Sequence, residues 1–309
     1  MEIISITQIS KGCAISKIGS LSLSSINFLL STFNFLLRSQ NFSKGRLFSI
    51  LLTSLVALHS VAQHAYHKQH LTLDSIYKNF GVTGACVVFN QSKNTYYYSD
   101  TIKMQTLQSP NNSFHLYAGL IGLESGVIKN YDTPNGDDTL TQEHLIKALK
   151  SNNPVFFSVN ARRIKQEKLQ NWLNLLNYGN RDISGGIETF WKDNTLKIST
   201  KQQFDLLKKL YYYNLPFSFE NIRLVKSTFY VTKLVNKNVY SYKVTGTQNG
   251  KPHAWYIGYV EFLNNTYMFV QSLQSNKVSA PTFEALNGEV MYQILHSLGI
   301  LGEEACGHL

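Results

Sequence analysis

The stretch SPNNSFHLYAGLIGLESGV, residues 109–127, begins like the nucleophile-bearing helix of an acyl-transfer enzyme but lacks the nucleophile. Such enzymes place a serine at the head of a buried helix and a base one helical turn later, on the same face. Here the two places hold Asn112 and His115. The amide nitrogen of Asn112 is no usable nucleophile because its lone pair is delocalised into the carbonyl, although His115 could act as a base near neutral pH. Three hypotheses follow: an enzyme with unusual chemistry, a relative that has lost its nucleophile, or a coincidence.

Other residue types that could carry chemistry give weaker patterns. His64, His67 and His70 would share one face of a helix and could hold a metal, but a polar tail is the commoner identity of such a patch. The cysteines are too far apart to form a metal-ligand pattern: Cys13, Cys86 and Cys306. Cys86 lies in an apolar run and is expected to be a small buried hydrophobic residue. We therefore expect no metal site and no cofactor.

Composition restricts the class of protein. The chain has 309 residues, of which 43% are hydrophobic and 16% charged, and this balance predicts a packed globular core. The net charge of +10 is compatible with anionic ligands, but no dense basic run with interleaved aromatic residues is present. We therefore do not expect nucleic-acid binding.

The N-terminal segment resembles an export signal. Lys44 and Arg46 precede the apolar run 47–58, and small residues follow, so we expect cleavage after Ala62. The run is too short for a comfortable membrane span, which needs roughly 20 apolar residues; an uncleaved anchor is the alternative. Residues 1–43 are expected to be an upstream extension that is not necessarily translated in the cell. The mature chain is thus expected to be periplasmic or secreted, with no membrane span.

The elements that must position Asn112 and His115 belong to residues 63–309, which we expect to form a single domain following the extension and signal peptide of residues 1–62. Alternating patterns predict a strand hairpin at 83–100, and helical spacing predicts a buried helix at 113–124. The remaining expected elements follow in order: a mostly helical block at 141–215, strands at 239–247, 254–263 and 266–273, and a final helix at 283–300. This order predicts an α+β fold, an antiparallel β-sheet flanked by N- and C-terminal helices plus a helical lobe, with a site between the lobes.

This order of elements resembles the class D serine β-lactamases and the penicillin-binding transpeptidases that share their fold. The resemblance extends over roughly residues 72–301 and is closest in LNYGNRDISGGIETFW, where Tyr178-Gly179-Asn180 and Phe190-Trp191 match family motifs. It implies a site built from a Ser-x-x-Lys pair, a second serine in a Ser-x-Val or Ser-x-Asn motif, and a Lys-Thr-Gly strand that orients the substrate and lines an oxyanion hole.

Several of the implied catalytic positions are altered in this chain. Asn112 stands at the nucleophile position and His115 at the base position. In the second motif Ser151 is kept, and Asn153 fits the transpeptidase form better than the class D form. The remaining matches are Val244 at the position of the anchoring Lys, Thr245 and Gly246 after it, Trp191 at the position that packs on the base, and Asn287 where class D enzymes offer an Arg. Lys243 is adjacent to Val244 but, on a strand, should face the opposite way.

Three functions are compatible with these positions. The favoured one is a catalytically impaired pseudoenzyme that binds a peptidoglycan-like peptide or a β-lactam non-covalently through Ser151, Tyr178, Asn180 and Thr245. The alternatives are an active class D β-lactamase, hydrolysing β-lactams through an acyl-enzyme, and a non-catalytic protein-interaction or sensor module. Each residue also has a purely structural interpretation, such as a helix cap for Asn112, a core histidine for His115 and a turn for Tyr178–Asn180.

Overall fold

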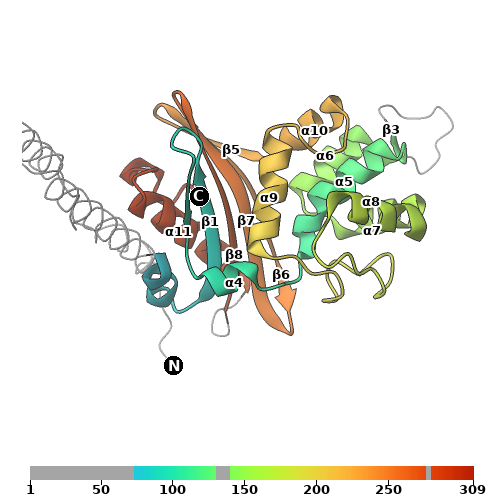
Figure 1. The fold of residues 1–309 in the computed structure, drawn as a ribbon, viewed down its shortest axis with the longest axis horizontal. Coiled ribbons are helices and arrows are strands. Elements are labelled where there is room, and N and C mark those ends of the chain that lie inside the picture. Colours follow the sequence, from blue (N-terminus) through green and yellow to red (C-terminus); the bar gives the residue numbers. More distant parts are fainter. Residues whose placement is uncertain (1–72, 130–139, 276–279) are drawn as a thin grey trace, which may run out of the picture. The chain divides into compact units, whose positions relative to one another are not determined.

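The computed structural model of the protein describes residues 73–129, 140–275 and 280–309, and at its centre these residues form a six-stranded sheet (Figure 1). All neighbouring strands are antiparallel, in the order β2-β1-β8-β7-β6-β5. The strands are β1 Thr83–Asn90, β2 Thr95–Tyr98, β5 Tyr230–Leu234, β6 Lys237–Gln248, β7 Lys251–Phe262 and β8 Asn265–Gln274. The expected hairpin β1–β2 thus joins the C-terminal strands through β8, a contact between distant parts of the sequence.

Strand β6 carries the Val-Thr-Gly segment. It pairs with β7 along its whole length but with β5 along only part of it. Its hairpin with β7 turns at Asn249 and Gly250, whose positive φ angles of 52° and 74° suit the tight turn between twisted strands. On its other side β6 pairs with β5 only as far as Ser241, which lies opposite Tyr230. Residues Tyr242–Gln248 therefore pair with β7 alone within the described part of the chain.

Helices cover both faces of the sheet (Figure 1). Helix α11 Ala280–Ser297 lies on one face, where Asn287 is fully buried and its Nδ2 donates to the carbonyl of Trp255 at 3.2 Å. Helix α9 Thr200–Tyr211 packs on the other face, in front of β7 and β8. The sheet therefore has a back covered by the C-terminal helix and a front that adjoins the helical region.

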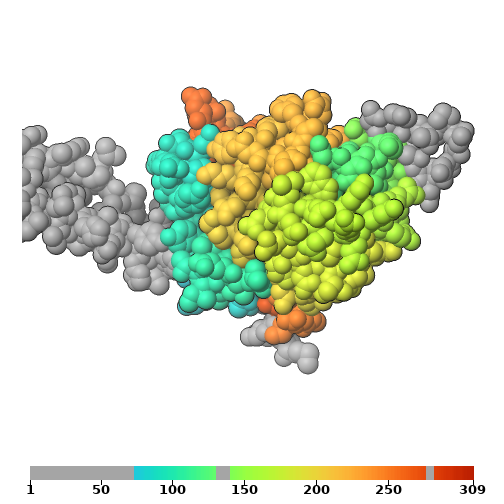
Figure 2. Space-filling model, turned by 45° about the vertical axis from the view of Figure 1, so that its right-hand side comes forward, coloured from blue at the N-terminus to red at the C-terminus, as the bar shows by residue number. Residues whose placement is uncertain are grey.

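The helical region consists of short helices that follow α5 in the sequence. In the space-filling view the green to yellow residues of this region cover one end of the molecule beside the yellow-orange α9 and α10 (Figure 2). Its elements and the other helices are α4 Thr101–Gln105, η2 Asn111–Phe114, α5 His115–Glu124, α6 Gln142–Lys150, α7 Pro154–Ile164, α8 Gln166–Leu176, α10 Phe219–Lys226 and η3 Glu303–Ala305. A short parallel pair, β3 Ile128–Lys129 and β4 Leu140–Thr141, accompanies them, and residues 73–79 are also helical.

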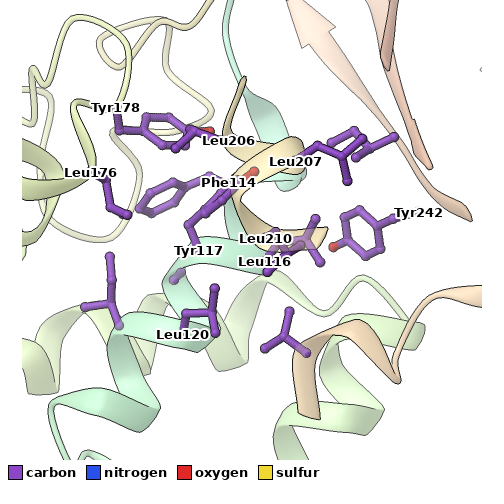
Figure 3. Packing of buried hydrophobic residues seen from close by; sticks show 14 of the residues in the cluster. Phe114, Leu116, Tyr117, Leu120, Leu176, Tyr178, Leu206, Leu207, Leu210 and Tyr242 are labelled. Atoms are coloured by element: carbon purple, nitrogen blue, oxygen red, sulfur yellow. The ribbon is translucent and has the colours of Figure 1, made fainter. Parts of the chain in front are cut away.

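One hydrophobic cluster joins the helical region to the front of the sheet (Figure 3). The rings of Phe114 and Tyr117 each lie 5.3 Å from the ring of Tyr178, in edge-on geometry. Leu207 of α9 and Tyr242 of β6 belong to the same cluster. Because α5 is buried nearly all round, the segment that begins with Asn112 is fixed by packing from several directions.

The α+β fold expected from the sequence is confirmed, with its antiparallel sheet, flanking helices and helical region. The expected strands are present, whereas β5 and the β3–β4 pair had no clear signal because they are short. The signal peptide, its cleavage point and the histidines at 64, 67 and 70 lie outside the described residues. Within the described residues, every helix is too short or too polar to traverse a bilayer, and no group of His, Cys, Asp or Glu side chains is arranged to hold a metal ion.

Candidate functional site

Asn112 lies in a 3₁₀ turn, Asn111–Phe114, that leads directly into α5. Its neighbours Asn111, Ser113 and Phe114 are buried, while Asn112 is partly exposed. No side chain caps either the turn or α5, so the interpretation of Asn112 as a helix cap is wrong. The main-chain carbonyl of Asn112 accepts a hydrogen bond from the Tyr242 hydroxyl of β6 at 3.3 Å. The residue at the nucleophile position is therefore held through its main chain, and it is partly exposed.

The hydroxyl groups of Ser109 and Ser113, on either side of Asn112, both donate to main-chain carbonyls. The Ser109 hydroxyl donates to the carbonyl of Trp191 at 3.0 Å, and the Ser109 carbonyl accepts from the indole of Trp255 at 3.0 Å. The Ser113 hydroxyl donates to the carbonyl of Pro110 at 2.7 Å. Both serines are fully buried. Neither hydroxyl is presented for reaction at the place that Asn112 occupies.

A buried histidine that carried no signal in the sequence ties this turn to the sheet. Asn111 has a positive φ of 47°, and its Nδ2 donates to Nδ1 of His253 at 3.0 Å. Burial lowers the pKa of His253 to about 3, so the ring is neutral and its Nε2 donates to Gln108 at 2.9 Å. A Cβ at Gly246 would lie 2.6 Å from Cγ of Asn111, so only glycine lets the turn approach β6 this closely.

His115, at the base position, is enclosed in the core. Its ring stacks on Phe157 at 3.8 Å and meets Trp191 edge-on at 6.0 Å. Neither ring nitrogen has a hydrogen-bond partner among the described residues. Burial lowers the pKa of His115 to about 3, the Asn152 side chain opposes this shift, and the positive charge of Lys192 adds to it. His115 is therefore a neutral, weakly basic ring, without the hydrogen bonds that the core-histidine interpretation would give it.

The second motif lies at the turn between α6 and α7. Ser151 is the exposed C-terminal cap of α6, whereas Asn153 caps α7 by accepting from the amides of Val155 and Phe156. Asn152, between them, has a positive φ of 55° and a buried Oδ1 without a partner in the described part of the chain. Of the residues in this turn, Asn152 is the one whose side chain raises the pKa of His115, against the larger lowering by burial.

Tyr178, Gly179 and Asn180 organise the loop that carries Trp191. Tyr178 is fully buried, and its hydroxyl lies 3.5 Å from Oε1 of Gln203. Asn180 is exposed but holds the loop together, because its Nδ2 donates to the Thr195 carbonyl at 2.8 Å and its Oδ1 accepts from the Lys197 amide at 2.9 Å. The turn expected for this motif is therefore present, and the loop that follows it carries Trp191, whose ring stacks on Phe114.

The third motif divides between the two faces of β6. Val244 is buried in the front cluster, and Gly246 lies on the same face. Thr245 and Lys243 alternate with them, and Lys243 donates to the main-chain oxygen of Leu309 on the back of the sheet. The prediction that Lys243 faces away is confirmed. The front of β6 carries no lysine at the place expected for the anchor.

The structure thus gathers some of the candidate residues and separates others. Asn112, His115, Trp191 and Tyr178 surround the start of α5, and Gly246 reaches them through Asn111. Of the other candidates, Asn153 and Asn180 are engaged in local hydrogen bonds, Ser151 is exposed at the end of α6, and Thr245 lies on the opposite face of β6 from Val244. Within the described residues, no serine, threonine or cysteine stands next to a titratable base at the head of α5. At the head of α5 the described residues thus place a carboxamide and a buried imidazole, whereas acyl transfer needs a nucleophile next to a base.

Comparison with known proteins identifies the family. The model of the penicillin binding protein transpeptidase domain matches residues 107–296. Regulatory protein BlaR1 of Bacillus licheniformis is 31% identical over 237 residues, which are 73% of this chain but only 38% of BlaR1. Beta-lactamase OXA-5 of Pseudomonas aeruginosa is 28% identical over 250 residues, 77% of this chain and 93% of that protein.

Comparison with solved structures finds the fold of the same relatives. The solved structure of the C-terminal domain of the Bacillus licheniformis BlaR penicillin-receptor matches with a TM-score of 0.65 and 28% identity, over 74% of this chain and 96% of that domain. The chain belongs to the penicillin-binding protein transpeptidase domain family and is similar to class D β-lactamases and to the BlaR receptor domain.

Proposed function

We propose that this chain is a non-catalytic member of its family that binds a peptidoglycan-like peptide or a β-lactam reversibly at the site headed by Asn112. One observation carries the proposal. The carboxamide of Asn112 and the buried, neutral imidazole of His115 stand at the two positions that we assign to acyl transfer. His115 has a pKa of about 3 and stacks on Phe157, so at neutral pH it is a poor base, and Asn112 offers it nothing to activate.

The size of the expected loss is large. Removing the nucleophile from a comparable constellation lowers kcat by about 10⁶, and oxyanion and binding effects alone leave about 10³ to 10⁴ over water. Ser109 and Ser113 do not replace it, because both hydroxyls already donate to buried carbonyls. What the site retains is the partly exposed carboxamide of Asn112 and a strand, Tyr242–Gln248, that pairs on one side only among the described residues. Such a strand suits an extended peptide.

The test separates covalent from reversible binding. The purified protein is incubated with a chromogenic cephalosporin and with a fluorescent penicillin, and turnover, labelling and intact mass are measured. We expect no turnover and no added mass, together with reversible chemical-shift changes in an NMR titration with benzylpenicillin. A covalent adduct on any serine would refute the non-catalytic assignment.

A restored variant provides the matched control. Asn112→Ser, His115→Lys and Val244→Lys together return the three altered positions to the residue types of the family motifs. Regained labelling by the fluorescent penicillin in this variant, with none in the original protein, would support the assignment of Asn112 and His115 to the nucleophile and base positions.

A second candidate, a ligand-sensing module, is favoured by the similarity to Regulatory protein BlaR1. Both candidate functions involve reversible ligand binding. A protein partner that binds only in the presence of the ligand would distinguish the sensing module. For either one, we propose that the protein is exported, on the basis of the signal-like segment that precedes Ala62. N-terminal sequencing of the protein from the cell envelope or medium tests this, and a mature chain that begins near Met1 would contradict it.

A further inference from the structure

Gly246 and His253 lie directly opposite each other on the paired strands β6 and β7, so a side chain at either place belongs to the same face of the sheet. Because Gly246 has no side chain, that of Asn111 fills the space in front of it, and a Cβ there would lie 2.6 Å from Oδ1 of Asn111. From this place the Asn111 amide donates to Nδ1 of His253 at 3.0 Å. Gly246 thus leaves a gap in β6 through which the turn before α5 reaches the next strand.

His253 continues a chain of hydrogen bonds that runs from this turn to α9. Its Nε2 donates to Oε1 of Gln108 at 2.9 Å, and Nε2 of Gln108 donates to the hydroxyl of Ser272 on β8 at 3.1 Å. The Ser272 hydroxyl lies 2.8 Å from that of Thr200, the first residue of α9. His253, Ser272 and Thr200 are buried, so a group of this chain that loses its partner is left unsatisfied in the core.

The neutral ring of His253 gives this chain one direction. Asn111 donates to Nδ1, which therefore carries no proton, and the ring proton lies on Nε2, facing the Gln108 oxygen. The same arrangement turns Oδ1 of Asn111 toward Gly246 and the Gln108 amino group toward Ser272. The opposite tautomer would require both carboxamides to turn over. One ring thus fixes the orientation of two amide side chains.

The main chain around Asn111 is held on both sides by other residues of the sheet. Trp255 and Tyr242 donate to the carbonyls of the residues two positions before and one position after it, at 3.0 and 3.3 Å. Asn111 itself has a φ of 47°, which residues other than glycine and asparagine seldom adopt. The side chain that holds it there is His253, and the residue that follows it is Asn112.

We propose that His253 is a positioning residue of the site: through the Asn111 carboxamide it holds the turn in the geometry that presents Asn112 to a ligand. This inference rests on the proposed function, because it names the residue that prepares the site for reversible binding. His253 is buried and acts on the ligand only through Asn111. None of the sequence motifs includes it.

The first measurement is made on the purified protein without a ligand. Long-range ¹H–¹⁵N NMR correlations of the His253 ring should show the proton on Nε2, and a proton on Nδ1 would overturn the proposed direction of the chain. Hydrogen exchange of the Ser113 amide, which donates to the Pro110 carbonyl at 3.1 Å, reports on the turn. His253→Val keeps an apolar side chain suited to a strand but loses both hydrogen bonds, so this amide should exchange about tenfold faster.

Two further variants separate positioning from a general loss of stability. His253→Gln can accept from Asn111 and donate to Gln108, so it should restore the slow exchange of the Ser113 amide. Val290→Ala truncates a buried side chain of α11 on the back of the sheet and should leave that exchange unchanged relative to other amides of the front. Unchanged exchange in His253→Val would overturn the role of His253 in holding the turn.

The second measurement is the affinity of the same variants for benzylpenicillin, by NMR titration. His253→Val should weaken binding about three- to tenfold, whereas His253→Gln and Val290→Ala should bind as the original protein does. Asn111→Gly tolerates the positive φ but removes the carboxamide, so it should weaken binding as much as His253→Val, and the double variant should bind no more weakly than either single one.

The outcomes distinguish this inference from the proposed function. Unchanged affinity in His253→Val, or equal weakening by Val290→Ala, would overturn the positioning role while leaving reversible binding in place. Absence of benzylpenicillin binding by the original protein would instead overturn the proposed function, and the exchange of the Ser113 amide would still decide whether His253 holds the turn.

Discussion

The two buried histidines make stability depend on pH. In the folded protein the pKa of His115 and that of His253 are lowered by burial to about 3, whereas a histidine in the unfolded chain titrates near 6.5. Below pH 6.5 the unfolded state therefore binds protons that the folded state refuses, so stability is complete above this pH and falls as the pH drops toward 3. At about 1.36 kcal/mol per unit, each histidine lowers the free energy of unfolding by about 2 kcal/mol at pH 5, and the two together by about 4 kcal/mol.

Urea unfolding followed by tryptophan fluorescence between about pH 8 and pH 5 measures this loss. A His115→Phe variant keeps a flat ring against Phe157 and removes the titrating group, so about half of the pH-dependent loss should disappear. A His253→Gln variant should remove the other half, whatever its effect on stability at pH 8. The measured quantity is the change with pH, which separates titration from the packing cost of each substitution. If His115→Phe lost as much stability between pH 8 and pH 5 as the original protein, the burial of a neutral His115 would be refuted.

Two further predictions concern the framework that holds the site. Gly179 has a positive φ of 52°, and a Cβ there would lie 1.7 Å from the carbonyl oxygen of Lys197, so Gly179→Ala should cost about 3 kcal/mol or more in urea unfolding. Gly81→Ala is the control: its φ is 65° but nothing lies within 4 Å of the added atom, so about 1 kcal/mol is expected, and equal costs would contradict the clash. Ser199→Ala removes the capping box that Ser199 forms with Gln202 at the start of α9 and should cost about 1 kcal/mol; an unchanged midpoint would show that the cap is dispensable.

Much of the fold followed from local patterns. The hairpin turn at Asn249 and Gly250 and the orientation of Lys243 were predictable, because turn chemistry and strand alternation depend only on neighbouring residues. The short strand β5 was not predictable, since its residues are mostly exposed and show little alternation. Its place at the edge of the sheet is set by pairing with β6 rather than by its own sequence.

The candidate site was less predictable because its geometry depends on contacts between distant residues. Sequence placed Asn112 and His115 one helical turn apart, but the 3₁₀ turn around Asn112 is fixed by His253, Trp255 and Tyr242, all more than 100 positions away. These three residues lie in apolar or aromatic strands that gave no sign of such a role. The functions assigned to the individual site residues remain predictions, and the variants described above test them.

The uneven pairing of β6 has a consequence for how the protein behaves among its own copies. Main-chain groups along Tyr242–Gln248 that have no neighbouring strand in the described residues are the kind of edge at which sheets from separate molecules join and aggregates begin. The end of this run, Thr245-Gly246-Thr247-Gln248, is polar and interrupted by glycine, which makes it a poor template for fibril growth. The composition of the strand thus limits self-association at the same edge that we propose as the binding place of an extended peptide.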